Sequence, residues 1–167
     1  MEDTHGRRVV PDGGNTGEDG TTSDDAAVGG EDAGETDRTA VVRELYDAIP
    51  FHRSLELEVL VVTPRHAETK IPFDDALVGN PDLQVLHGGI ISSIVDLTGA
   101  AVFIGERGDY TPTVDLRVNY LEAAGKQPLY ATSTVDRSGE NIGVASVEVE
   151  SGDTVCATGT GVYKLGN

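Results

Sequence analysis

Residues 86–96 read LHGGIISSIVD, and this stretch opens the one long helix that the sequence predicts, from Gly88 to about Gly105. Apolar residues face nearly every side of that helix, which is typical of a helix surrounded by protein. One carboxylate, Asp96, interrupts the apolar run. Burying an unpaired charge is costly. The chain must therefore either expose Asp96 or give it a function.

Periodicity around this helix predicts the other elements. An amphipathic helix is expected over 39–49, ending at Pro50, followed by a strand pair within 55–73 and a loop over 74–85. Four alternating strands follow, in the ranges 111–122, 128–137, 142–150 and 154–165. Alternation of this kind indicates an antiparallel sheet with one packed face. The predicted fold class is α+β, a curved antiparallel β-sheet wrapped around one long central helix.

Residues 1–38 differ in composition from the rest of the chain. They hold eleven acidic and three basic residues and almost no large apolar side chains. Such a segment cannot bury enough apolar surface to offset its ordering entropy. We therefore predict a disordered acidic tail over 1–38 and one folded domain over 39–167. No apolar region follows Arg7 and Arg8, so a signal peptide is not expected.

Charge and cysteine content exclude several functions. The net charge of −17 argues against nucleic-acid binding, which requires a basic surface. With Cys156 as the single cysteine and four scattered histidines, no Cys/His metal site is expected. No stretch approaches the ~20 apolar residues of a membrane span, so we expect a soluble, cytoplasmic protein without membrane contacts. The acidic, lysine-poor composition is similar to that of proteins from salt-loving microbes.

Four motifs in order resemble the hotdog-fold acyl-CoA thioesterases, and within them the phenylacetate-degradation-type (PaaI-like) group. They are Asn80 in a loop, His87-Gly88-Gly89 at the start of the central helix, Asp96 nine residues after the histidine, and Thr113-Val114-Asp115 on a strand. The resemblance covers about residues 40–165. It implies a hotdog fold and an acyl-CoA substrate with no further cofactor. It also implies a homodimer or homotetramer whose active site lies at the dimer interface.

The resemblance gives each motif a role in thioester hydrolysis. Asp96 activates water as a general base or attacks the carbonyl itself, and the sequence leaves both routes open. The Gly88 amide is the oxyanion donor, because the first N–H groups of a helix are unpaired and glycine admits close approach. Thr113, opposite the acid, holds the water or the carboxylate. The implied substrate-positioning residues are Asn80, His87 and Gly89.

Coenzyme A carries phosphates, so an acidic protein needs local basic groups to bind it. Arg137, in a predicted turn, is the first candidate, followed by Arg107 and Arg117. For any one of them, a solvated surface arginine paired with an acid is the alternative.

Alternatives remain open for both the site and the function. Asp96 could share an exposed polar face with Ser92 and Ser93, and the glycine pair could form only a tight turn. A non-catalytic acyl-CoA binding module would use the same cleft. An enoyl-CoA hydratase-type hotdog enzyme fits the motifs less well.

Overall fold

The computed structural model describes residues 37–166. The predicted acidic tail over 1–38 therefore lies outside the described residues except at its end, where Asp37 and Arg38 already belong to the first helix. The Asp37 carboxylate caps that helix by accepting a hydrogen bond from the Ala40 N–H at 3.1 Å. Helix α1 thus includes Arg38, the last residue of the predicted tail.

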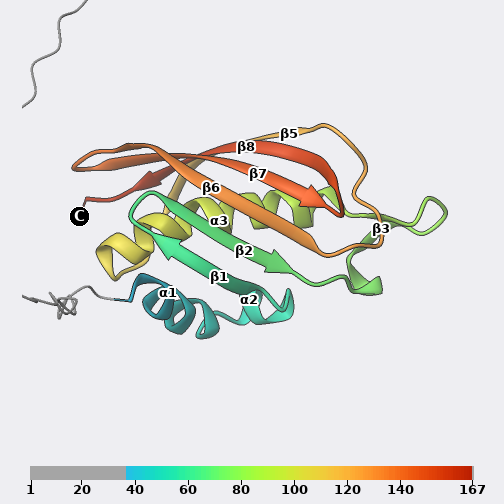
Figure 1. The fold of residues 1–167 in the computed structure, drawn as a ribbon, viewed down its shortest axis with the longest axis horizontal. Coiled ribbons are helices and arrows are strands. Elements are labelled where there is room, and N and C mark those ends of the chain that lie inside the picture. Colours follow the sequence, from blue (N-terminus) through green and yellow to red (C-terminus); the bar gives the residue numbers. More distant parts are fainter. Residues whose placement is uncertain (1–36, 167) are drawn as a thin grey trace, which may run out of the picture. The chain divides into compact units, whose positions relative to one another are not determined.

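The order of elements predicted from the sequence is confirmed (Figure 1). The helices of the described chain are α1 (Arg38–Asp47), α2 (Pro50–Ser54) and α3 (Gly88–Arg107), with a 3-10 turn, η1 (Asp75–Leu77). The strands are β1 (Glu58–Thr63), β2 (His66–Ile71), β3 (Val78–Asn80), β4 (Val85–Leu86), β5 (Thr113–Tyr120), β6 (Leu129–Ser138), β7 (Ile142–Ser151) and β8 (Thr154–Lys164).

Six strands form one antiparallel sheet in the order β1-β2-β6-β7-β8-β5. Hairpins join β6 to β7 and β7 to β8, with Leu129 opposite Ser151 and Ile142 opposite Lys164. Buried and exposed residues alternate along β6 and most of β7, as expected for a sheet with one packed face. The sheet curves around α3 (Figure 1).

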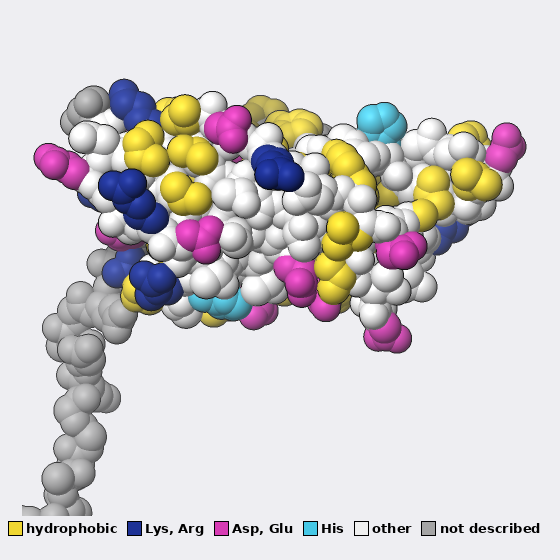
Figure 2. Space-filling view, turned by 90° about the horizontal axis from the view of Figure 1, so that it is seen from above, with side chains coloured by type: hydrophobic (Ala, Val, Ile, Leu, Met, Phe, Trp, Pro, Cys, Tyr) yellow, Lys and Arg dark blue, Asp and Glu magenta, His cyan; other side chains and the backbone are white. Residues whose placement is uncertain are grey.

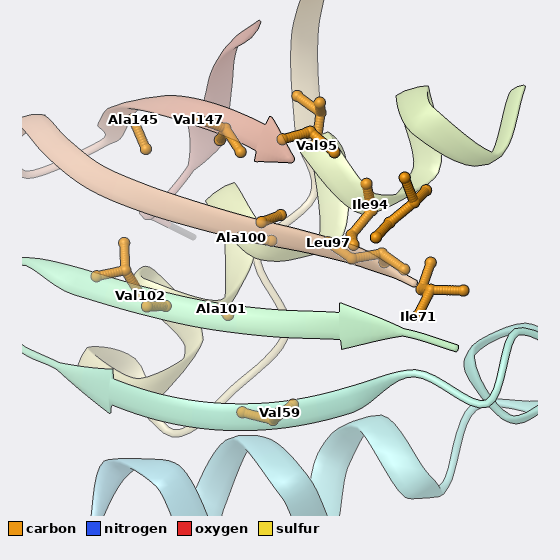
Figure 3. Packing of buried hydrophobic residues seen from close by; sticks show 14 of the residues in the cluster. Val59, Ile71, Ile94, Val95, Leu97, Ala100, Ala101, Val102, Ala145 and Val147 are labelled. Carbon is orange, nitrogen blue, oxygen red and sulfur yellow. The ribbon is translucent and has the colours of Figure 1, made fainter. Parts of the chain in front are cut away.

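Helix α3 is the centre of the core. Side chains from α3, β1, β2 and β7 fill the space between helix and sheet (Figure 3). A buried hydrogen bond of 2.6 Å between the Thr98 and Thr69 hydroxyls ties the helix to β2. By length and composition α3 could cross a membrane, but 67% of its most apolar window is buried inside the domain. Its apolar character is therefore explained by the core that it forms.

Two local predictions were wrong, and both errors concern proline or loop residues. Pro50 does not simply end the first helix: it occupies the first turn of α2, where its fixed φ and missing N–H are tolerated. Ile49 before it is extended, as a residue preceding proline prefers. The predicted loop over 74–85 contains η1 and the short β3–β4 pair, which places Asn80 at a strand end.

Strand β5 is one edge of the sheet and carries apolar side chains at the surface. Val114 is 60% exposed, Tyr120 53% and Leu121, just beyond the strand, 54%. Figure 2 views the molecule from the side where β5 and β8 lie, with apolar side chains between scattered charged groups. An exposed apolar sheet edge is a surface on which another strand can pair.

Candidate active site

Asp96 lies in the third turn of α3 and is half-buried. The Thr113 hydroxyl donates a hydrogen bond of 2.7 Å to its Oδ1 atom. A bulge in β5 between Thr113 and Asp115 accompanies this contact, and bulges commonly redirect a side chain toward a site. The predicted pairing of Thr113 with the helix acid is present in the structure.

A buried tyrosine fixes the backbone at Asp96. The Tyr163 hydroxyl donates to the Asp96 main-chain carbonyl at 3.0 Å. It reaches the helix because position 99 is glycine: a Cβ there would lie 2.2 Å from the tyrosine oxygen. Burial, and secondarily the charge of Asp96, raises the pKa of Tyr163, so this phenol stays neutral. This contact was not predicted, because it joins residues far apart in the chain.

The Asp96 side chain opens onto a cavity of about 190 Å³. The walls are mainly apolar and come from α1, α2, α3 and the segment that leads into β5. The lining residues are Tyr46, Ile49, His52, Asp96, Leu97, Ala100, Ile104, Tyr110, Thr111, Pro112 and Thr113. A mostly apolar concavity with a few polar groups is the usual form of a small-molecule site.

Burial keeps the ionisable neighbours of Asp96 uncharged. It raises the pKa of Tyr46, an effect to which Tyr163 and Asp96 add. It also lowers the pKa of the His52 imidazole, against the opposing effects of the Tyr46 backbone and the Asp96 charge. No described residue that lines this cavity is Lys or Arg.

The glycine pair at the start of α3 leaves one backbone donor available. The His87 Nδ1 atom accepts the Gly89 N–H at 2.9 Å, and the His87 carbonyl accepts the Ile90 N–H at 2.9 Å. Within the described chain the Gly88 N–H has no hydrogen-bond acceptor. His87 is thus the helix cap, and Gly88 carries the unpaired donor that the sequence placed there.

Two side chains to which the sequence assigned no role in the site hold the Gly88 peptide. The Tyr120 and Ser92 hydroxyl oxygens lie 3.0 Å and 3.2 Å from the Gly88 carbonyl oxygen. The two hydroxyls are also within hydrogen-bond distance of each other, so one donates to the carbonyl and the other donates to the neighbouring hydroxyl. The predicted polar position of Ser92 on α3 therefore serves the backbone of the helix start.

Asp96 and Gly88 do not meet within one copy of the chain. They are eight residues apart on one helix, which separates them by about 12 Å along its axis. A thioester carbonyl is far smaller than that span. A single copy of the chain therefore presents the acid and the oxyanion donor at two different places.

The other predicted substrate residues have local roles. The Asn80 side-chain oxygen accepts from the backbone N–H groups of Asp82 and Leu83, both at 3.0 Å, and so forms the β3–β4 turn. The Gly89 N–H is used by His87, so it is not a free donor. A substrate contact by either residue stays a prediction.

The three predicted coenzyme A arginines lie in two places. Arg107, in the last turn of α3, donates to the Gly139 carbonyl at 3.3 Å, and the Arg137 guanidinium lies beside the same glycine. Arg117 is exposed on β5, opposite Thr160. The structure thus brings Arg107 and Arg137 together and separates Arg117 from them. Within residues 37–166 no group of three or more His, Cys, Asp or Glu is arranged to hold a metal ion.

Comparison with known proteins identifies the family. The model of the family described as Thioesterase superfamily matches residues 83–158. The medium/long-chain acyl-CoA thioesterase YigI of Salmonella typhimurium is 31% identical over 134 residues, covering 71% of this chain and 86% of that protein. The chain belongs to the thioesterase superfamily. YigI of Escherichia coli K12 is 29% identical over 134 residues, which again cover 71% of this chain and 86% of that protein.

Solved structures of the thioesterase superfamily agree with the fold. A Shewanella oneidensis protein related to the superfamily is 28% identical, with a TM-score of 0.67, and covers 77% of this chain and 97% of that chain. Zebrafish thioesterase superfamily member 2 is 25% identical, with a TM-score of 0.65, and the match covers 77% of this chain and 95% of the zebrafish chain. The fold is the hotdog thioesterase fold, which confirms the fold expected from the sequence.

Proposed function

We propose that this chain is an acyl-CoA thioesterase that hydrolyses the thioester to a free acid and coenzyme A. One observation carries the proposal: a carboxylate set in an apolar helix is held by Thr113 at the wall of an apolar cavity. An apolar wall suits an acyl chain, and an oriented carboxylate suits the activation of water. The YigI relatives named as medium/long-chain acyl-CoA thioesterases support acyl chains of that length.

In the proposed mechanism Asp96 removes a proton from water, which attacks the thioester carbonyl, or it attacks that carbonyl directly. The oxygen of the carbonyl gains negative charge and is stabilised by the Gly88 N–H, a donor already oriented by the helix. The C–S bond then breaks, and the thiolate of coenzyme A takes up a proton. Where Asp96 has attacked directly, water then hydrolyses the acyl–Asp96 anhydride, which releases the free acid and restores the carboxylate. Thr113 orients Asp96, while His87, Gly89 and Asn80 shape the entrance beside Gly88.

We further propose that two protomers build each site. The separation of Asp96 and Gly88 along α3 requires a second copy to bring an acid and a donor to one carbonyl. The exposed apolar edge at β5 offers a surface for an isologous dimer with a continuous sheet. Thr113 begins this edge strand, so the dimer contact would lie beside the site. Pairing of two dimers into a homotetramer extends this proposal.

The proposal also covers the subgroup, the location, the cofactor need and the coenzyme A contacts of the protein. The chain would belong to the PaaI-like group and work in the cytoplasm as a soluble protein, with α3 as its core helix. Water and the chain's own groups suffice for hydrolysis, so no cofactor besides the coenzyme A of the substrate is proposed. Arg107 and Arg137 together would bind its phosphates, with Arg117 as a separate contact.

Thiol release from a panel of aliphatic and aryl acyl-CoAs in high-salt buffer tests this function. We expect hydrolysis by the wild type and a loss of about 10² or more in kcat for Asp96→Asn, since removal of a general base costs at least that. Asp115→Asn, which changes a nearby strand acid in the same way, is the matched control. Binding without turnover by the wild type would instead identify an acyl-CoA binding module.

A further inference from the structure

Two buried tyrosines donate hydrogen bonds to consecutive main-chain carbonyls of α3. The Tyr163 hydroxyl, from β8, donates to the Asp96 carbonyl at 3.0 Å, and the Tyr46 hydroxyl, from α1, donates to the Leu97 carbonyl at 2.6 Å. In an α-helix each of these carbonyls already accepts the N–H group four residues later. Helix formation therefore requires neither phenol, and the two bonds instead tie this turn of α3 to elements outside the helix.

The next residue of the same turn is held from a third element. The Thr98 hydroxyl donates to the Ile94 carbonyl at 2.6 Å and lies 2.6 Å from the Thr69 hydroxyl on β2. A hydroxyl has one hydrogen, so Thr69 is the donor in the bond between the two threonines. The turn that carries Asp96 is thus anchored to α1, β2 and β8.

The position of Tyr163 is set by its own surroundings. Its side chain is fully buried, and its ring packs against Phe103. Gly99 and Gly161 leave room for its hydroxyl, because a Cβ at either position would collide with that oxygen. Tyr163 is not among the residues that line the Asp96 cavity. It can therefore affect a substrate in that cavity only through the groups that it holds.

We propose that Tyr163 and Tyr46 are positioning residues, which fix the backbone of Asp96 for its attack on the thioester or on water. The inference rests on the proposed thioesterase function. Thr113 orients the carboxylate, whereas the two phenols hold the main chain from which that carboxylate extends. Reacting atoms must be closely aligned, and a misplacement of about 1 Å can lower a rate by about 10²-fold.

The two tyrosines differ in their access to the substrate. Tyr46 lines the Asp96 cavity on the α1 side, whereas Tyr163 lies outside it. Burial raises the pKa of both phenols, so each retains its donor hydrogen at neutral pH. Loss of the Tyr163 hydroxyl should therefore slow only the chemical step, while loss of the Tyr46 hydroxyl should also weaken substrate binding.

The single-turnover rate of octanoyl-CoA hydrolysis and the steady-state KM test this inference. Tyr163→Phe should slow the chemical step about tenfold, roughly the effect of one lost hydrogen bond, and leave KM within about twofold of the wild type. Tyr46→Phe should slow that step by a similar factor and raise KM. Because both hydroxyls hold the same turn, the double variant should lose less than the product of the two single losses.

Tyr130→Phe is the matched control, because Tyr130 is an exposed tyrosine on β6 that does not line this cavity. It should keep the wild-type rate and KM. Denaturant titration of each variant separates a purely structural role from a positioning role. A Tyr163→Phe chain that is less stable but has the wild-type single-turnover rate would overturn the proposal, as would a loss confined to KM.

The same experiment separates this inference from the proposed function. If Tyr163→Phe does not fold, the single-turnover rate of Tyr46→Phe decides alone. A wild-type rate in the tyrosine variants, with Asp96→Asn inactive, would leave the thioesterase proposal standing. Failure of the wild type to release thiol from any acyl-CoA would overturn both proposals.

Discussion

The two halves of α3 have opposite surroundings although they form one continuous helix. Every residue from Leu97 to Gly105 is buried, whereas only Ile91, Ile94 and Val95 are buried between Gly88 and Asp96. The second half is covered by the sheet and the other core elements of the same chain. The first half retains an unpaired N–H and a half-buried carboxylate.

This contrast separates residues that stabilise the fold from residues available for chemistry. A helix wholly within a core would bury apolar side chains along its full length. Here Ser92, Ser93 and Asp96 lie in the half that is only partly covered, whereas the hydroxyl of Thr98 in the other half is buried and bonded to Thr69. Substitutions in the two halves should therefore change different quantities: stability in the second half and turnover in the first.

The largest effect is expected in the buried half, at Phe103. Its ring is 0% exposed and packs against Tyr163 with ring centroids 5.5 Å apart. Phe103→Ala should lower the free energy of unfolding by about 3–5 kcal/mol, the usual cost of removing a buried ring. Denaturant titration measures this, with Phe103→Leu as a milder control. Equal stability of Phe103→Ala and the wild type would contradict the proposed division.

Gly88 in the other half should affect turnover instead. Gly88→Pro removes the N–H at the first helical position, where proline is well tolerated, and His87 before it is already extended. We expect kcat to fall by about 10²–10³, the loss typical of one oxyanion donor, with little change in stability.

Gly88→Ala is the control for that substitution, because it keeps the N–H. Its added Cβ would lie 3.4 Å from the Tyr120 ring, an ordinary contact distance. Alanine should therefore retain most of the wild-type kcat. A proline variant as active as the alanine variant would show that this N–H does not stabilise the transition state.

A smaller effect is expected at Thr113, which contacts the first half from β5. Thr113→Val keeps the shape but removes the hydrogen bond to Asp96. Loss of one hydrogen bond to a charged group should lower kcat by about tenfold or somewhat more. Thr113→Ser restores the hydroxyl and should recover turnover. Unchanged steady-state kinetics for the valine variant would remove Thr113 from the mechanism.

The smallest effect concerns pH and His52. Burial lowers the pKa of His52 below its ordinary value of 6.5, so the unfolded chain takes up a proton first as the pH falls. The stability that neutral His52 contributes is complete above about pH 6.5 and is lost as the pH drops below it. Denaturant titrations at several pH values from 8 to 5 should show that the free energy of unfolding falls more steeply with pH for the wild type than for His52→Phe. Parallel curves would contradict the prediction.

The sequence predicted the elements whose periodicity is strong. Alternation along β6 and β7 and the apolar run of α3 indicated a sheet around a helix, and both are present. Short elements were missed: the β3–β4 pair is too short to show a period. Pro50 was interpreted only as a helix end. A proline is common both just after a helix and in the first turn of the next one, so the sequence does not distinguish the two positions.

The candidate site was predictable only where a motif is contiguous. Asp96, Gly88 and His87 lie close in sequence, and Thr113 follows in a recognisable strand motif. By contrast, the contact of Tyr163 with the Asp96 backbone and the approach of His52 to the same cavity depend on tertiary packing. A lone histidine in a short helix carries no signal of the cavity that it lines.

The central claim is that an acid from one protomer and a donor from its partner share each site. Co-expression of Asp96→Asn and Gly88→Pro chains with two different tags, followed by sequential affinity purification, isolates the mixed dimer. One of its two sites would carry both defects and the other neither, so we predict about half of the wild-type kcat per dimer, while each parent dimer is nearly inactive. A mixed dimer as inactive as its parents would contradict the shared site.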